Sequence, residues 1–255
     1  MNGPGLYPYC GPAPLPADWL GQWNFDPILL AAMALGAGLH AAALRNAGEW
    51  RARQTGFAAF WLTLAALFIS PLCALSSALF SVRVAHHVIL IAVAAPLLVL
   101  SLPARWRAVG FSPGMLGAIF GIHIAIVWLW HAPAPYAAAM SSHLVFWVMQ
   151  LSLTVTAVGL WLAVLSPAAP FGHALLVLLG SVIQMGLLGA VITFARVPLY
   201  VPHFASTEPF GLSALSDQQL AGLIMWVPAT LPYLGVALLL IGRGLVRAPA
   251  SGRAS

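Results

Sequence analysis

Seven apolar runs, each long enough to cross a bilayer as a helix, dominate this sequence. The hydrocarbon core of a membrane is about 30 Å thick, which an α-helix spans with about 20 residues. Backbone polar groups must pair with one another in lipid, so each run is expected to be helical. The chain is 62% apolar and 6% charged, with too few charges to cover a soluble surface. We therefore predict an all-α, polytopic membrane protein, a seven-transmembrane-helix bundle over residues 27–44, 55–80, 84–102, 114–130, 144–165, 173–195 and 220–241.

The arginines predict the orientation of this bundle, because cytoplasmic loops keep an excess of positive charge. With seven helices the loops alternate between the two sides. Eight of the ten arginines collect on one side, and only Arg83 and Arg196 fall on the other. This places the N-terminus outside and the C-terminus in the cytoplasm. Only residues 81–83 separate the second and third runs, so these helices are expected to form a tight hairpin.

On this basis the chain divides into three parts. Residues 1–26 form a Pro-rich extracytoplasmic segment without the basic start and apolar core of a signal peptide, so we expect it to be retained. Residues 27–241 form the transmembrane domain, and residues 242–255 form a cytoplasmic tail. Cys10 lies in the Pro-rich segment and Cys73 in an apolar run. From this difference in setting we predict no disulfide between them.

The sequence argues against several classes of function. The net charge of +5 is not gathered into a run of adjacent arginines, so we predict no nucleic-acid partner. The sequence has no nucleophile elbow, phosphate-binding loop, zinc-protease helix or pair of catalytic carboxylates, and we predict that the protein is not an enzyme. Every Asp and Glu lies outside the seven runs, which argues against a transporter. The lipid bilayer is the first predicted partner.

Histidines are the most informative polar residues in a chain with so few charges. Five of the eight are predicted at the outer side: His86, His87, His131, His143 and His203. Further candidate ligands are predicted on the same side: Met140, Met225, Asp217 and Cys10. Imidazole combined with sulfur suits copper, and zinc less well. A simpler interpretation stays open, in which interfacial histidines keep one edge of the ring in water and the other in apolar surroundings.

Helical geometry narrows the choice of ligands. Adjacent residues on a helix point about 100° apart. We therefore expect one of His86 and His87 to be a ligand and the other to lie behind it or towards lipid. The fifth helix carries a polar stripe that should face inward: His143, Trp147, Gln150 and Thr154.

Two further alternatives concern polar residues at helix ends and between helices. Gln150, Gln184 and His123 are equally compatible with a set of hydrogen bonds that hold the bundle together. Asp217 follows Ser216 directly before the last run, where capping of that helix competes with metal ligation.

Three strings in the sequence resemble a known family. They are WHAPAPY from Trp130, the pair His86-His87 followed by Ala95-Pro96-Leu97-Leu98, and DQQLAGLIMWVP from Asp217. Their order and spacing look like those of the CtaG family of cytochrome c oxidase assembly factors. This resemblance implies a multi-pass protein of the bacterial cytoplasmic (inner) membrane that assists maturation of a haem-copper oxidase by delivering or inserting copper. The implied partners are cytochrome c oxidase subunits or copper chaperones.

The resemblance also implies a set of ligands. His87, His131, Asp217 and Met225 fall on motif positions of the family. Where the family often has a further His, four residues before His87, this chain has Arg83. Where it often has a His pair in the fifth helix, Phe146 and Gln150 stand here. His86 and His143 are the replacements at hand, so the predicted copper site comprises His87, His131, His86, His143, Met225 and Asp217.

Two other functions remain as alternatives. One is an accessory structural subunit of a respiratory complex, in which the histidines only form hydrogen bonds. The other is a haem-binding membrane cytochrome, because haem needs axial histidines from facing helices at matching depth. The candidate haem pairs are His40 with His173 on the cytoplasmic side and His87 with His131 on the outer side.

Overall fold

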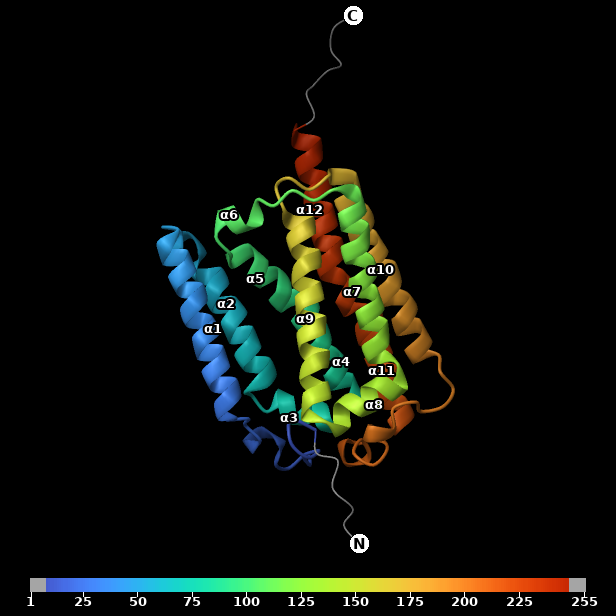
Figure 1. The fold of residues 1–255 in the computed structure, drawn as a ribbon. Helices are drawn as coiled ribbons and strands as arrows, with labels where there is room; N and C mark the ends of the chain where they lie inside the picture. Colours follow the sequence, from blue (N-terminus) through green and yellow to red (C-terminus); the bar gives the residue numbers. More distant parts are fainter. Residues whose placement is uncertain (1–7, 248–255) are drawn as a thin grey trace, which may run out of the picture.

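The protein is a bundle of helices that run roughly along one axis (Figure 1). The structure is a computed structural model that describes residues 8–247, with side chains up to residue 244. No strand occurs in this part of the chain. Six helical stretches are long and apolar enough to cross a membrane, and the bent pair of α2 and α3 makes up to seven. The predicted all-α, multi-spanning fold is therefore confirmed.

The helices follow one another in two halves. The first half contains α1 (Pro27–Asn46), α2 (Trp50–Phe68), α3 (Leu72–Ala78), α4 (Phe80–Ile89), the π-helical η2 (Leu90–Ala94), α5 (Ala95–Ser101) and α6 (Ala104–Arg107). The second half contains α7 (Pro113–His131), α8 (Pro133–Ser141), α9 (His143–Leu165), α10 (Phe171–Thr193), α11 (Ala214–Trp226), η5 (Pro228–Thr230) and α12 (Leu231–Arg247). Short 3-10 turns lie outside these helices: η1 (Trp19–Gly21), η3 (Val201–His203) and η4 (Glu208–Phe210).

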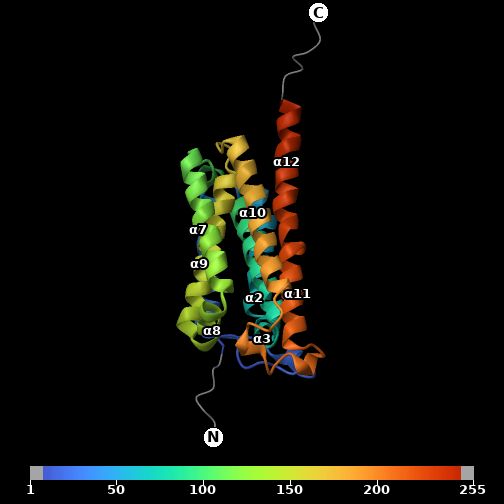
Figure 2. The same cartoon turned by 90° about the vertical axis from the view of Figure 1, so that its right-hand side faces the viewer.

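Helix α9 is the centre of the bundle and packs against α5, α7, α8 and α10. Helix α11 packs against α4 and α10, whereas α1 packs on α2 at one edge. Figure 2 shows α7, α8 and α9 on one side of the molecule and α11 and α12 on the other. We call the end of the bundle where α3 and α8 lie the α3–α8 end, and the opposite end the α6 end (Figure 1).

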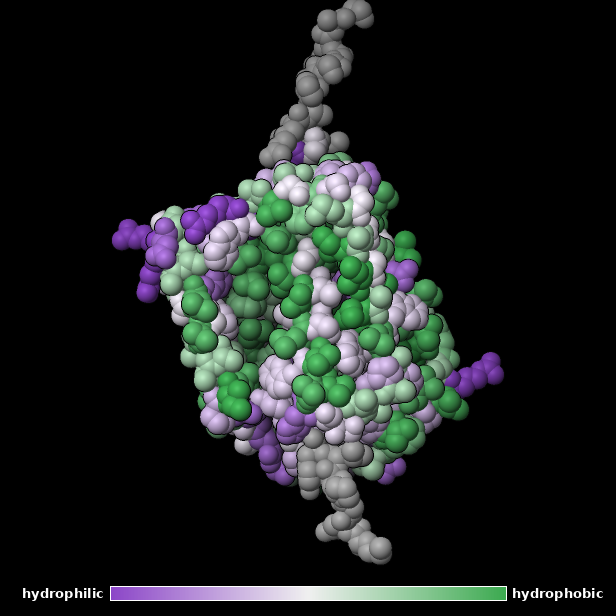
Figure 3. Space-filling model, in the orientation of Figure 1, coloured by the Kyte–Doolittle hydropathy of each residue, from purple (hydrophilic) through white to green (hydrophobic). Residues whose placement is uncertain are grey.

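The surface agrees with a membrane environment. Apolar residues cover the middle of the face shown in Figure 3, and hydrophilic residues gather towards its two ends. Large apolar side chains such as Leu62, Leu144 and Val155 are more than half exposed. In water such a surface would drive aggregation, whereas in lipid it is the ordinary exterior of a spanning helix.

The boundary between the second and third predicted helices lies elsewhere than expected. Helix α2 ends at Phe68 instead of continuing to residue 80, and α3 is bent from it by 43°. Pro71 lies in this break, where its missing N–H interrupts the helical ladder. The next helix, α4, then begins at Phe80. Arg83, predicted in a loop between two spans, therefore lies inside α4 with its side chain fully buried.

A π-helical turn follows directly in the same column. Within η2 the N–H of Ala95 bonds to the carbonyl of Leu90, one residue further back than in an α-helix. The next N–H in this pattern would belong to residue 96, which is proline and has none. The indole N–H of Trp161 in α9 donates instead to the Ile91 carbonyl at 2.7 Å. An aromatic residue on the neighbouring helix thus satisfies the backbone group that Pro96 leaves without a partner.

A disulfide joins Cys10 and Cys73, whose Cα atoms lie 5.2 Å apart. The expectation that the two cysteines stay unpaired is therefore wrong. Their settings differ in sequence, but the apolar run around Cys73 ends in the short helix α3, to which the N-terminal segment folds back. Tyr9, next to Cys10, stacks on Phe146 of α9 with a centroid distance of 5.1 Å. Residues 8–13 are thereby fastened across the α3–α8 end.

Candidate metal centre

Two histidines from separate helices meet inside the bundle. His87 lies in α4, and His131 is the last residue of α7. Their ring centroids are 5.4 Å apart, and the ring planes are nearly perpendicular at 86°. The two residues are only 1% and 3% exposed, respectively. The fold therefore brings together two histidines that the sequence predicts to share a site, although 44 positions of the chain separate them.

The hydrogen bonds of His131 fix which of its nitrogens is available. Its Nδ1 lies 2.7 Å from the Val127 carbonyl oxygen, which can only accept a hydrogen bond. In the neutral ring Nδ1 therefore carries the proton, and Nε2 keeps its lone pair. This Nε2 is buried and has no hydrogen-bond partner. A ring held by one nitrogen with the other free is the usual arrangement of a metal-binding histidine.

His87 has a comparable arrangement through Gln150 of α9. The amide nitrogen of Gln150 lies 3.4 Å from His87 Nε2, while His87 Nδ1 and the amide oxygen of Gln150 are both buried without a partner. Turning the amide by 180° would let His87 Nε2–H donate to the amide oxygen. The lone pair of Nδ1 would then be available to a metal ion. Gln150 is suited to orient the ring in either case.

His86 is buried beside this pair rather than facing lipid. Its ring lies edge-on to Phe68 with a centroid distance of 5.0 Å and is 5.9 Å from the ring of His87. Neither of its ring nitrogens has a hydrogen-bond partner. Because α4 begins at Phe80, His86 and His87 lie almost two turns inside the helix. They do not open the helix at its outer end, as the sequence suggested.

Two other predicted ligands, His143 and Asp217, have different surroundings. His143, the first residue of α9, is exposed, and its ring lies 5.5 Å from that of Tyr9. The Asp217 carboxylate accepts hydrogen bonds from the backbone N–H groups of Phe80 and Ser81 and from the Ser81 hydroxyl. Within residues 8–247, no three His, Cys, Asp or Glu side chains lie close enough together to hold a metal ion.

Asp217 caps a helix, but not its own. The sequence suggested Asp217 as a cap for its own helix, α11. In the structure Ser213 caps α11, and its hydroxyl accepts the N–H of Ser216. Asp217 instead caps α4, the helix that carries His86 and His87.

Met225 is fully buried in α11. Helices α4 and α11 both start at the α3–α8 end and run in the same direction (Figure 1). Met225 follows Asp217 by eight residues, and His87 follows Phe80 by seven, so both lie about 10–12 Å along their helices. Because Asp217 is bonded to Phe80, this matches the depth of the thioether to that of His87.

Arg83 is a feature that sequence reasoning placed wrongly. Its guanidinium carbon lies 5.1 Å from the centre of the Phe146 ring, and all three guanidinium nitrogens are buried without a hydrogen-bond partner. Arg83 precedes His87 by four residues and so lies on the same side of α4. A charged residue within an apolar run is typical of a loop between two spans, and only the packed fold shows that the Arg83 side chain is enclosed within a helix bundle.

A network of hydrogen bonds lies at the α3–α8 end, outside the membrane-spanning helices and next to the histidine pair. His203 Nδ1 lies 3.2 Å from the Ala78 carbonyl oxygen and must donate to it, so Nε2 accepts the hydroxyl of Tyr136 at 2.7 Å. Burial lowers the pKa of His203 to about 4, opposed by the bond to Ala78 and assisted by the charge of Arg83. Burial also raises the pKa of Tyr136. Both groups are therefore neutral at pH 7.

Tyr200 links the same loop to the histidine pair. Its hydroxyl donates to the backbone carbonyl of His131 at 2.7 Å, and its ring stacks on Phe80 at 3.6 Å. The long connection after α10 thus holds the ends of both ligand-bearing helices. These tyrosines could have been suspected only from the length of the loop and the motif around Tyr136.

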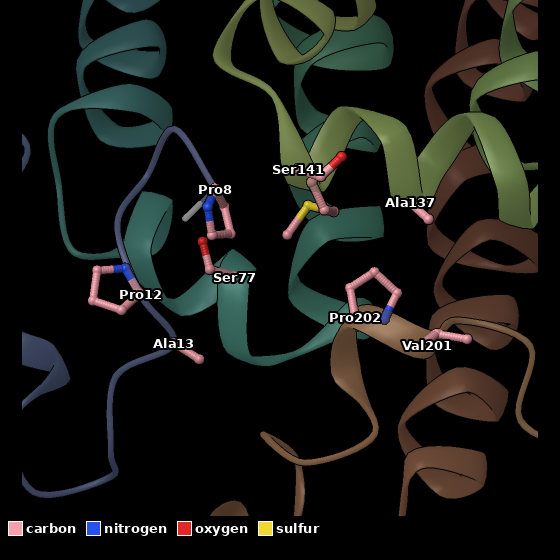
Figure 4. Close-up of a pocket in the computed structure, with 9 residues that line it drawn as sticks. Pro8, Pro12, Ala13, Ser77, Ala137, Ser141, Val201 and Pro202 are labelled. Carbon is pink, nitrogen blue, oxygen red and sulfur yellow. The ribbon is translucent and has the colours of Figure 1, made fainter. Parts of the chain in front are cut away.

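A small cleft opens at this end of the molecule. Figure 4 shows residues of the N-terminal segment, α3, α8 and η3 around it, among them Pro8, Ser77, Ala137 and Pro202. Its volume is about 260 Å³, and Met140 also lines it. Several residues that line the cleft are sequence neighbours of Cys10 and Cys73, which form the disulfide.

The remaining histidines do not form a second site at the α6 end. His40 Nε2 donates to the Ser101 carbonyl at 3.2 Å, and its Nδ1 accepts the indole N–H of Trp61 at 3.3 Å, so both ring nitrogens are engaged. His173 is exposed at the start of α10. His123 bonds to Thr156 at 3.0 Å and thereby links α7 to α9, as the structural interpretation of this residue expected.

Comparison with known proteins identifies one family. Residues 37–245, which is most of the chain, match the family described as cytochrome c oxidase caa3 assembly factor (Caa3_CtaG). No curated protein and no solved structure shows a significant match.

Proposed function

We propose, from the premise that the chain belongs to the family of cytochrome c oxidase caa3 assembly factors, that it supplies copper to the oxidase through the His87–His131 pair. Family membership establishes a role in assembling the oxidase in a membrane. The observation that carries the copper proposal is the pair itself, because two imidazole rings from different helices lie 5.4 Å apart in a buried place and each keeps a ring nitrogen without a hydrogen-bond partner.

The orphaned nitrogens fit a metal ion better than they fit a packed core. A buried polar atom without a partner costs about 1–3 kcal/mol, and the pair and its neighbours contain several such atoms. Imidazole binds copper well, and Cu(I) accepts a low number of ligands. When bound, copper would be the cargo of the protein and would be held by His87 and His131. Gln150 and the Val127 carbonyl would orient the two histidine rings. This is a non-catalytic role.

Met225 is the best candidate for a third ligand. It is fully buried, its depth along α11 matches that of His87 along α4, and thioethers favour Cu(I). His86, adjacent to His87, is available to receive the ion during transfer. Asp217 contributes by fixing the start of α4, and His143 lies at the surface, where an arriving copper protein would meet it first.

Two independent features support the proposed compartment. A disulfide persists where the surroundings are oxidising, which includes the outer side of a bacterial cytoplasmic membrane. The arginine distribution predicts that the same α3–α8 end lies outside. We infer that copper enters from this side, brought by a copper chaperone and passed to an oxidase subunit. The cleft lined by Met140 is the proposed entrance.

Copper titration of the purified protein tests this proposal. Wild-type protein in lipid nanodiscs should bind a single Cu(I) in competition with a chromogenic chelator, and the double variant His87→Ala/His131→Ala should bind none. His173→Ala is the matched control, because this exposed histidine lies at the α6 end and its loss should leave binding unchanged. Unchanged stoichiometry in the double variant would remove the site.

A second measurement separates copper delivery from a purely structural role. Cells that produce the double variant should assemble an oxidase with less copper, while the variant still copurifies with oxidase subunits. If the oxidase keeps its full copper content, the protein acts as a scaffold and the histidines serve only its packing.

A further inference from the structure

Arg83 is a permanent positive charge with no negative partner beside it. The residue is 0% exposed, and none of its guanidinium nitrogens has a hydrogen-bond partner. Within the described residues the one ion pair with atoms closer than 4.0 Å joins Arg53 and Glu49, far along the chain. Arginine remains charged under all ordinary conditions, so it cannot avoid the problem by losing a proton.

Phe146 compensates only part of this charge. The guanidinium group lies over the face of its ring at 5.1 Å, and a desolvated cation–π contact contributes about 2 kcal/mol. Moving an unpaired ion out of water costs several kcal/mol even after relaxation. The ring also covers just one face of the planar group. The acceptor near the N–H donors, which point outward in the plane, is the hydroxyl oxygen of Tyr136, which carries no negative charge and leaves most of the donors unmatched.

The acidic and phenolic groups nearby are already engaged. Asp217 accepts hydrogen bonds from Phe80 and Ser81 at the start of α4. Tyr136 donates its hydroxyl to His203 and is neutral. The local structure therefore supplies a fixed cation without supplying the anion that balances it.

A second set of donors faces the same region. His86 follows Arg83 by three residues, and positions three apart lie on one side of a helix. A neutral imidazole always carries one N–H, and neither nitrogen of His86 makes a hydrogen bond of good geometry, although the Leu67 carbonyl lies near the ring. Arg83 and His86 thus offer several N–H donors and one positive charge at neighbouring places on α4, both fully enclosed by the bundle.

We propose that Arg83 and His86 form a binding site for a small monovalent inorganic anion of the halide class, which in the cell is chloride. The enclosure of both side chains within a span favours a small ion over an organic one. A single negative charge neutralises the guanidinium group, whereas a divalent ion would leave a net charge in a medium of low dielectric constant. The site requires no copper, and although it shares His86 with the proposed delivery function, it can be tested in the metal-free protein.

Radioactive chloride provides the direct test. Metal-free full-length protein in nanodiscs of zwitterionic lipid would be dialysed against labelled chloride, with gluconate keeping the ionic strength constant. We expect saturable binding of about one chloride per chain, together with a rise in the midpoint of thermal unfolding as chloride replaces gluconate. The variant Arg83→Met should lose both effects. The matched control Arg196→Met removes an exposed arginine and should keep both.

Three outcomes would overturn the site: no saturable chloride binding by the wild type, binding unchanged in Arg83→Met, or equal loss in Arg196→Met. If Arg83→Met does not fold, Arg83→Lys replaces it. This variant keeps the charge but loses the planar fork of donors, so chloride should bind about tenfold more weakly. Unchanged affinity in Arg83→Lys would contradict the role of the guanidinium group. Because no copper is present, these results are independent of the Cu(I) titration.

Discussion

The carboxylate of Asp217 in α11 accepts the backbone N–H of Phe80 in α4 at 2.6 Å, across 137 positions of the chain. Together with its bonds to Ser81, this contact closes the N-terminal end of the helix that carries Arg83, His86 and His87. A carboxylate at a helix N-terminus satisfies free amide groups and interacts favourably with the helix dipole. The most specific family string thus supports the histidines from a distance.

Removing this cap should destabilise the protein without removing copper. Asp217→Asn loses the negative charge and part of the acceptor capacity, so we expect a loss of about 1–3 kcal/mol in the free energy of unfolding. Chemical denaturation in detergent micelles measures it. Glu208→Gln, which alters an exposed acid in η4, is the control and should be neutral. A variant that loses copper while keeping its stability would instead identify Asp217 as a ligand.

The disulfide should stabilise the N-terminal segment. Cys10 and Cys73 are 63 positions apart, and closing a loop of this length stabilises a chain by at most about 4 kcal/mol in the chain-entropy model. Cys10→Ser/Cys73→Ser should therefore unfold at a lower temperature than the wild type. Alkylation before and after reduction, followed by mass measurement, checks the bond itself. Labelling of both cysteines without reduction would show that no bond exists.

Two glycines allow α10 and α11 to pack closely. A Cβ atom on Gly222 would lie 2.6 Å from the Gly189 carbonyl oxygen and would also collide with the Thr193 hydroxyl. Gly222→Ala should therefore separate the helices and lower the free energy of unfolding by about 1–3 kcal/mol. Gly235→Ala in α12 is the control, since its Cβ would meet open space. Equal stability of the two variants would contradict the close approach.

His203 should make the protein sensitive to mild acid. Its pKa is about 4 in the folded protein, below the ordinary value of about 6.5. The unfolded chain binds a proton first, so the stability that neutral His203 contributes is complete above pH 6.5. It is lost as the pH falls from about 6.5 to about 4. His203→Asn should have a shallower decline in thermal midpoint over this range than the wild type. His143→Asn, at an exposed position, should decline like the wild type.

Local hydropathy was enough to predict most of the fold. The helices α1, α7, α9 and α10 begin and end within two residues of the predicted runs, because long apolar stretches in lipid have few alternatives. The bend at Pro71 is what a proline inside an apolar run favours, whereas the start of α4 at Phe80 was missed, since the residues around it are as apolar as a continuous helix. Where the packing decides, as at Arg83, hydropathy gave the wrong location.

The candidate site was predictable only in part. Motif positions and helix ends pointed to His87 and His131, which do meet. Their depth depends on where α4 begins, and that is set by Asp217 from a distant helix. The disulfide depends in the same way on a segment folding back across the bundle. Such features arise from contacts between remote parts of the chain, which no local pattern records.

Pro96 and Trp161 form a pair whose effects on folding depend on each other. The indole N–H of Trp161 bonds to the carbonyl that the N–H of residue 96 would otherwise occupy. Any other amino acid at position 96 brings its own N–H to that oxygen and makes the indole redundant. The hydrogen-bond part of the cost of losing Trp161 therefore arises only while proline is present, whereas the loss of its buried ring, which stacks on Tyr233, is costly in either case.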